Sequence, residues 1–202
     1  ADYNDPAGWQ DYLGSDLSDT ITGISSSVFH GIAGDDVFHS GLGQSNQVFI
    51  GGSGADTYKI DKAGTMTVAD SGSSENDKII ADGIGWYSDT TYSLIIDNRH
   101  LFVYDTVSEQ QIYAIDWRSP EHKIEQVVLS DGTYTYEDIE ESIVGSANHL
   151  GDYSWEQLAD QDTGLLNAEI EFYKAFYDTQ NLTSADYNDP AGWQDYLGSD
   201  LS

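Results

Sequence analysis

The sequence predicts a mainly β protein that ends in a helical linker. Over residues 14–80, short apolar or aromatic segments alternate with Gly- and Asp-rich turns, which indicates a series of short strands. Over residues 81–143, longer strand patterns follow, separated by turn signals. Over residues 144–184, apolar side chains recur at helical spacing. With 202 residues, of which 39% are apolar, the chain is long enough to bury a core.

A nine-residue pattern, GGxGxDxUx with U a large apolar residue, organises the first of these regions. Residues 31–39 (GIAGDDVFH) and 51–59 (GGSGADTYK) fit the pattern well. Residues 14–22 (GSDLSDTIT) fit it more loosely, because Leu17 stands in place of the second loop glycine. Glycine permits the left-handed backbone that such tight loops need. Each short strand then buries one large side chain, and these are Ile21, Phe29, Phe38, Phe49 and Tyr58.

The nonapeptides resemble those of the RTX family, whose glycine-rich repeats wind into a calcium-binding parallel β-roll. Together with the strands that follow, the resemblance covers about residues 14–143. It implies a short parallel β-roll over residues 14–80, continued by an antiparallel β segment, with each nonapeptide forming half a coil. Calcium takes six to eight hard oxygen ligands, which stacked loops of this kind can supply. The alternative is that these segments are ordinary Gly/Asp turns between strands.

The aspartates predict that only one side of the roll binds calcium. Asp19, Asp36, Asp56 and Asp77 follow one another at intervals of 17, 20 and 21 residues, close to the length of one full coil. The half-turns between them carry Ser27 and Gln47 where the aspartate would stand, and neither offers a carboxylate. We therefore expect a one-sided ladder of aspartates.

The expected calcium ions lie between neighbouring loops of that ladder. One would bind between loops 14–19 and 31–36, a second between 31–36 and 51–56, and a third between 51–56 and 70–77. The RTX resemblance implies that backbone carbonyls complete the coordination. The expected ligands are the carboxylates of Asp16, Asp19, Asp36, Asp56 and Asp77 and the carbonyls of Gly31, Ala33, Gly34, Gly51, Ser53 and Gly54.

Residues 81–143 predict strands that cover the open end of the roll. The Ile-Glu-Gln and Asp-Gly-Thr sequences within 124–133 are similar to a segment that often follows RTX repeats. An exposed strand edge needs such a cover because its backbone groups are unpaired. We expect a short helix over 136–143. The expected strands are 92–96, 101–104, 111–115 and 124–133, the first two forming a hairpin.

The last part of the chain predicts helix. Leu166, Ile170, Tyr173 and Tyr177 recur at a spacing that places them on one helical face. Residues 154–157 have the form of a capping box. We therefore expect a helical linker over 144–184.

An 18-residue duplication joins the two ends of the sequence. Residues 1–18 recur without a mismatch at 185–202, 184 positions later. The duplication has two possible origins. It is either engineered, or it shows that the chain is part of a long tandem array of near-identical 184-residue modules, as in fibres, stalks and surface layers. Asp5, Pro6 and Gly14 are typical of a helix start and stop, so we expect a capping helix. The expected divisions are a capping helix or linker 1–13, an RTX β-roll 14–80, a β-rich segment 81–143, a helical linker 144–184 and the start of the next repeat 185–202.

The charge balance excludes some partners. Seven Lys and Arg face 36 Asp and Glu, giving a formal net charge of −29. Nucleic acid and anionic membranes both need basic side chains, so neither is an expected partner. Two explanations fit this excess of acidic residues. The surface is adapted to high salt, or the carboxylates bind cations. The absence of cysteine excludes disulfides and thiolate metal sites.

The sequence contains no recognised catalytic motif, so we do not expect an enzyme. We expect a calcium-dependent structural repeat module of a secreted cell-surface, fibrous or adhesive protein, which folds on calcium binding outside the cell. The family resemblance implies a bacterial protein and type I secretion. The expected partners are neighbouring identical repeats, arranged head to tail, with cell-surface glycans as a further candidate. The alternatives are a calcium-binding accessory module of an extracellular enzyme and a carbohydrate-binding adhesin domain.

Overall fold

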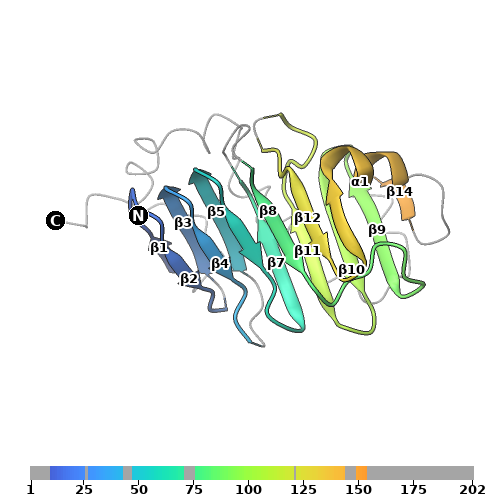
Figure 1. The fold of residues 1–202 in the computed structure, drawn as a ribbon, viewed down its shortest axis with the longest axis horizontal. Coiled ribbons are helices and arrows are strands. Elements are labelled where there is room, and N and C mark those ends of the chain that lie inside the picture. Colours follow the sequence, from blue (N-terminus) through green and yellow to red (C-terminus); the bar gives the residue numbers. More distant parts are fainter. Residues whose placement is uncertain are drawn as a thin grey trace.

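The chain winds as a coil whose half-turns alternate between two facing sheets (Figure 1). The computed structural model describes residues 10–25, 27–42, 47–70, 76–120, 122–143 and 149–153. In spatial order, the first sheet contains β1 (Gln10–Leu13), β3 (Ser27–Ala33), β5 (Gln47–Ser53), β7 (Gly64–Val68), β11 (Gln110–Ala114), β10 (His100–Asp105), β9 (Thr91–Ile96) and β14 (His149–Tyr153). The second contains β13 (Gly132–Thr135), β12 (Gln126–Leu129), β8 (Lys78–Ala81), β6 (Thr57–Lys59), β4 (Val37–His39) and β2 (Thr20–Thr22).

The core is built from one large side chain per strand, stacked from coil to coil. In the first sheet, Phe29 and Phe49 are directly paired and their rings stack at 5.2 Å. In the second sheet, Phe38 and Tyr58 are paired and stack at 5.2 Å. The large apolar positions expected from the nonapeptides all belong to this core or pack against it, with Ile21 at its partly buried end. Burying each such ring contributes about 1.5–3 kcal/mol, so the repeat itself supplies the core.

The mainly β prediction and the parallel stacking are confirmed, and the later strands extend the roll. The β9–β10 hairpin and β11 lie close to where the sequence predicts them. However, β11 pairs in parallel with β7, and β12 pairs in parallel with β8. The coil therefore continues for one more turn, and the antiparallel strands β9, β10 and β13 close the sheets beyond it. The helix α1 (Tyr136–Ser142) follows β13, capped by Thr135 and Asp138 in a capping box.

Two predicted helical regions contain strands where the structure describes them. Residues Gln10–Leu13, expected at the end of a capping helix, form β1 and pair with β3. The Tyr12 ring stacks on Phe29 at 5.0 Å, so this segment covers the start of the roll as expected, but it does so as a strand and not as a helix. Residues His149–Tyr153, expected within a helical linker, form β14 beside β9. The remaining helical predictions, over 1–9 and 154–184, lie outside the described residues, as does the second copy of the duplication.

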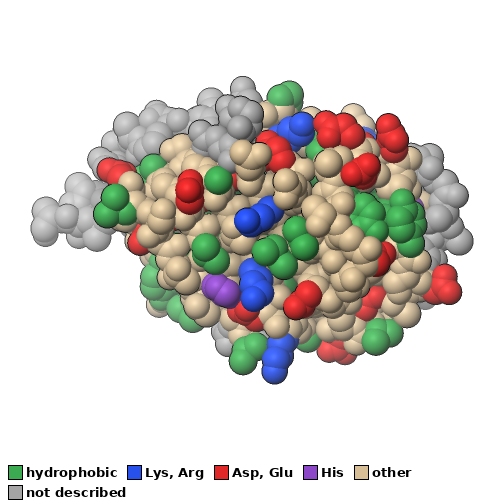
Figure 2. Space-filling model, in the orientation of Figure 1, with side chains coloured by type: hydrophobic (Ala, Val, Ile, Leu, Met, Phe, Trp, Pro, Cys, Tyr) green, Lys and Arg blue, Asp and Glu red, His purple; other side chains and the backbone are tan. Residues whose placement is uncertain are grey.

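Charged side chains are spread over the described surface. On the face seen in Figure 2, the few basic side chains follow a band from the top to the bottom of the molecule, and acidic side chains lie on both sides of it. Lys59 on β6 and Lys78 on β8 are partly exposed on the second sheet. Within the described ranges, no helix has the length and apolar character needed to cross a bilayer.

Candidate metal centre

Five carboxylates line one side of the coil, one at each crossing from the first sheet to the second. We call them the carboxylate ladder. Four were expected from the sequence, and the fifth was not. All five lie just before strands of the second sheet, and they are Asp19, Asp36, Asp56, Asp77 and Glu125.

A chain of hydrogen bonds links the members of the ladder. The backbone N–H of Asp36 donates to Asp56 Oδ1 at 2.8 Å, and that of Asp56 donates to Asp77 Oδ1 at 2.7 Å. The same contact begins the ladder, from Asp19 to Asp36 Oδ1 at 2.7 Å. It also ends the ladder, from Asp77 to Glu125 Oε2 at 2.8 Å. One oxygen of each carboxylate after the first is therefore held by the preceding coil.

The second oxygens of the ladder are the notable feature. Within the described residues, Asp36 Oδ2, Asp56 Oδ2 and Glu125 Oε1 are buried and accept no hydrogen bond. Leaving a buried polar atom unpaired costs roughly 1–3 kcal/mol, and more when the group is charged. Burial, followed by repulsion from Asp77 and Asp36, raises the pKa of Asp56 to about 7. Burial likewise raises the pKa of Asp36. A bound cation would relieve both the repulsion and the unpaired oxygens.

The first glycine of each loop leaves room for oxygen atoms. A Cβ on Gly31 would lie 2.1 Å from Asp36 Oδ2 and 2.5 Å from the Gly51 carbonyl oxygen. A Cβ on Gly14 would lie 3.0 Å from Asp19 Oδ2 and 2.8 Å from the Gly31 carbonyl oxygen. At both places a carboxylate of one loop and a carbonyl of the next coil share one small space. These spaces correspond to the first two expected calcium sites.

The other expected ligands lie in the loops that precede the ladder residues. Asp16 is exposed in the first loop. The Ser53 carbonyl already accepts a hydrogen bond from the Gly34 N–H at 2.8 Å. Ala33 ends β3, and its N–H reaches the Ser15 carbonyl at 3.4 Å. Gly34 and Gly54 form the loop turns, with φ of 105° and 133°.

Three buried carboxylates converge where the third site was expected. One ligand oxygen each from Asp56, Asp70 and Asp77 lies within 4.8 Å of the other two, and this group could hold a metal ion. The Tyr58 hydroxyl donates to Asp70 Oδ1 at 2.7 Å. Burial and the neighbouring carboxylates raise the pKa of Tyr58 far above its usual value, so the phenol stays neutral. A neutral hydroxyl adds a fourth oxygen beside the group.

Two members of this region were missed by reasoning from sequence. Glu125 belongs to the Ile-Glu-Gln sequence that resembles RTX-associated segments, but it lies 48 residues beyond Asp77 and so outside the nonapeptide period. Asp70 follows β7 in a loop without the repeat pattern. Its place beside Tyr58 results from the stacking of coils, which the local sequence does not reveal.

The donor chemistry of the whole centre is uniform. The ladder, its neighbouring carbonyls and Tyr58 offer oxygen atoms, which favours hard cations over zinc or copper. No protein-family model matches this sequence, and a search of curated proteins finds no match. The carboxylate ladder and its surroundings are therefore the basis for assigning a function.

Proposed function

We propose that this chain is a calcium-dependent structural module of the RTX type, in which calcium binding and folding are coupled. The observation that carries the proposal is the set of buried, unpartnered carboxylate oxygens at Asp36 and Asp56. Without a cation these atoms oppose folding, because their charges are desolvated and close to one another. With a cation, the same atoms become ligands that join one coil to the next.

The residues of the ladder would divide the work of holding calcium. Asp19 and Asp36 would each share an ion with the carbonyl of the next coil's first glycine. Asp56, Asp70 and Asp77 would surround a further ion, with the Tyr58 hydroxyl beside it. Bound calcium supplies positive charge and six to eight coordination positions. The hydrogen-bonded oxygens of Asp36, Asp56 and Asp77 keep these carboxylates aimed at their sites. Asp19 is held instead through its Oδ2, which accepts hydrogen bonds from the N–H and the hydroxyl of Ser15 at 2.8 Å.

Calcium is favoured over magnesium by the rigidity of these donors. Carbonyls and carboxylates are fixed by strand pairing and by the backbone hydrogen bonds of the ladder. Magnesium requires a near-ideal octahedron at about 2.0–2.1 Å and retains several waters, which buried oxygens of this kind would exclude. Calcium accepts irregular geometry and longer distances.

The setting that suits this chemistry is outside the cell. In a calcium-poor cytoplasm the chain, at −29, would stay extended by repulsion, which suits export. At roughly millimolar extracellular calcium the ladder would be neutralised and the roll would close. The module would then act as a stiff spacer in a cell-surface, fibrous or adhesive protein.

The duplicated segment supplies a way to join modules. Residues 194–197 repeat the sequence of β1, Gln-Asp-Tyr-Leu. In a tandem array this second copy would form the first strand of the next roll. Its tyrosine would then stack on the residue of the next module that is equivalent to Phe29. Successive modules would then be joined head to tail through a strand, in place of the helix that the sequence suggested.

Circular dichroism tests the proposal. Removing metal with a chelator should abolish most of the far-UV β signal at pH 7.5, and millimolar calcium should restore it. Magnesium at the same concentration is the matched control and should restore little. A spectrum that does not change on chelation would overturn calcium-coupled folding.

A further inference from the structure

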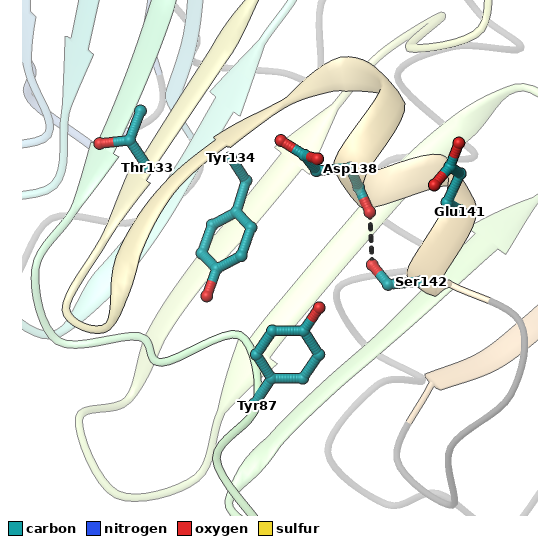
Figure 3. A pocket seen from close by; sticks show the side chains of 6 residues that line it. All are labelled: Tyr87, Thr133, Tyr134, Asp138, Glu141 and Ser142. Atoms are coloured by element: carbon teal, nitrogen blue, oxygen red, sulfur yellow. Dashed lines mark hydrogen bonds between the residues drawn. The ribbon is translucent and has the colours of Figure 1, made fainter.

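A pocket outside the ladder lies between α1, β13 and the turn before β9. It has a volume of about 500 Å³. Figure 3 shows the side chains that line it. Two tyrosine side chains form one side of it, and residues of α1 form the other. The six residues that line it are Tyr87, Thr133, Tyr134, Asp138, Glu141 and Ser142.

The two tyrosines form a corner of aromatic faces. The rings of Tyr87 and Tyr134 are 6.0 Å apart between centroids, with an angle of 68° between their planes. Tyr87 is 69% exposed, so its ring is accessible to a ligand. Burial and Asp131 raise the pKa of Tyr134 to about 12, so its ring remains a neutral phenol. Two such faces at a steep angle can contact one ligand at the same time.

The corner is held in place before any ligand binds. The Asp131 carboxylate accepts hydrogen bonds from the backbone N–H groups of Trp86 at 3.0 Å and Tyr87 at 3.1 Å. Asp131 also bonds the Tyr134 side chain. The Trp86 indole N–H donates to Ser142 Oγ at 2.8 Å, which fixes α1 to the same turn. Preorganised walls reduce the entropy lost on binding.

The charges of the pocket select a cation. Asp138 and Glu141 both line it, and none of its six lining residues is basic. Hydrogen bonds from the backbone and side chain of Thr135 lower the pKa of Asp138, so that carboxylate is ionised at neutral pH. A sugar could also stack on the rings and donate its hydroxyl hydrogens to the carboxylates, but it would leave their negative charge unbalanced, so the charge of the lining favours a cation. Aromatic faces with neighbouring carboxylates are the usual surroundings of bound organic ammonium groups.

We propose that this pocket binds an organic ammonium group, such as a trimethylammonium or a lysine-type amine, between Tyr87 and Tyr134. The rings contact the cation through their faces, and Asp138 and Glu141 supply the opposite charge. The group could belong to a free small molecule or to a lipid head group, because both present the same chemistry. The site is separate from the carboxylate ladder, and once the protein is folded its chemistry does not involve the ion that the ladder binds.

Binding of choline to the folded protein, followed by aromatic ¹H–¹³C NMR at fixed calcium, tests the proposal. Choline should produce saturable shifts of the Tyr87 and Tyr134 rings. Its uncharged isostere, 3,3-dimethyl-1-butanol, should bind at least about tenfold more weakly, because it lacks the cation. Phosphatidylcholine vesicles form a second arm: co-sedimentation would assign the group to a lipid, and its absence alongside choline binding would assign it to a free ligand.

Three variants sharpen the result. Tyr87→Ala should weaken choline binding about tenfold, and Glu141→Gln should weaken it by a smaller factor. Tyr92→Ala, which removes a 39% exposed tyrosine from β9, is the matched control and should leave binding unchanged. Equal binding of the uncharged isostere, a preference for methyl glycosides over choline, or no saturable shift would each overturn the proposal. The calcium midpoint of folding, measured for Tyr87→Ala, separates loss of the pocket from loss of the fold.

Discussion

The backbone N–H of Asp36 donates to Asp56 Oδ1 at 2.8 Å, while the other oxygen of Asp56 is buried and accepts no hydrogen bond within the described residues. One carboxylate thus combines a satisfied oxygen and an unsatisfied one. The first fixes its position, and the second is available to a cation. This division of roles makes Asp56 the most informative position for mutation.

Asp56→Asn should have opposite effects with and without calcium. Without metal it removes a buried charge next to Asp36 and Asp77, so the roll should become more stable. With calcium it removes a ligand, so the calcium midpoint of folding should rise about tenfold. Calcium titrations followed by circular dichroism measure both effects. Asp82→Asn, an exposed aspartate in the turn after β8, removes the same charge and should change neither. A shift of the same size in both variants would show that net charge alone matters.

The metal-free protein should be more stable at pH 5 than at pH 8. The pKa of Asp56 is about 7 in the fold, against an ordinary value of 3.8. Between these values the folded state binds more protons than the unfolded state, so the free energy of unfolding falls as pH rises. Above pH 7 the penalty is fully present, and below about pH 4 it disappears. The far-UV β signal of metal-free protein, recorded across this range, gives the folded fraction at each pH and hence the slope. Asp56→Asn should flatten it, and an unchanged slope in that variant would assign the effect to other groups.

Ile32→Gly should stabilise the roll by about 1 kcal/mol. Ile32 has φ of 82°, a left-handed conformation that a β-branched residue rarely adopts. Its partner on the next coil is Gly52, with φ of 100°, and the nonapeptide pattern asks for glycine at both places. Gly52→Ala is the converse variant and should destabilise, because its Cβ would lie 2.3 Å from the Ile32 carbonyl oxygen. Thermal unfolding in calcium measures both. A lower unfolding temperature for Ile32→Gly would mean that the side chain of Ile32 contributes more than its backbone strain costs.

Deleting one copy of the duplication at a time tests the joining strand. Without residues 185–202 the protein should still fold with calcium and stay monomeric. Without residues 1–13 the edge of β3 loses β1, and the identical strand of a neighbouring molecule can replace it, so head-to-tail chains should form. Light scattering after size-exclusion chromatography measures the mass of each. The double deletion is the control and should give no chains. Failure of the 1–184 protein to fold with calcium would show that the second copy belongs to this module's own core.

The short strands of the roll and their buried side chains were predictable, because each strand and its loop are encoded within nine residues. Phe38, Phe49 and Tyr58 were expected inside the roll from local pattern alone, and they are buried there. The alignment of Asp19, Asp36 and Asp56 on one side followed from the length of a coil. Both features depend on spacing along the chain, which is what a sequence displays.

Contacts across long separations were not predictable in this way. The proline and glycine near β1 suggest a helix. The segment forms a strand because it pairs with β3 and Tyr12 stacks on Phe29, and both contacts are with the next coil. Between Asp77 and Glu125 the chain leaves the coil to form β9 and β10. The regular spacing that identifies the other ladder carboxylates is therefore interrupted before Glu125. Asp70 has no repeat partner in sequence and joins the centre through Tyr58.

The central claim is that calcium ions bind between the coils at the carboxylate ladder. Anomalous X-ray scattering from crystals of the calcium-loaded protein, recorded at a long wavelength where calcium scatters anomalously, tests it most directly. The account predicts difference peaks beside Asp36 Oδ2 and within the Asp56, Asp70 and Asp77 group, each about 2.3–2.6 Å from its oxygen ligands. A well-ordered roll with no anomalous peak along the ladder would contradict it.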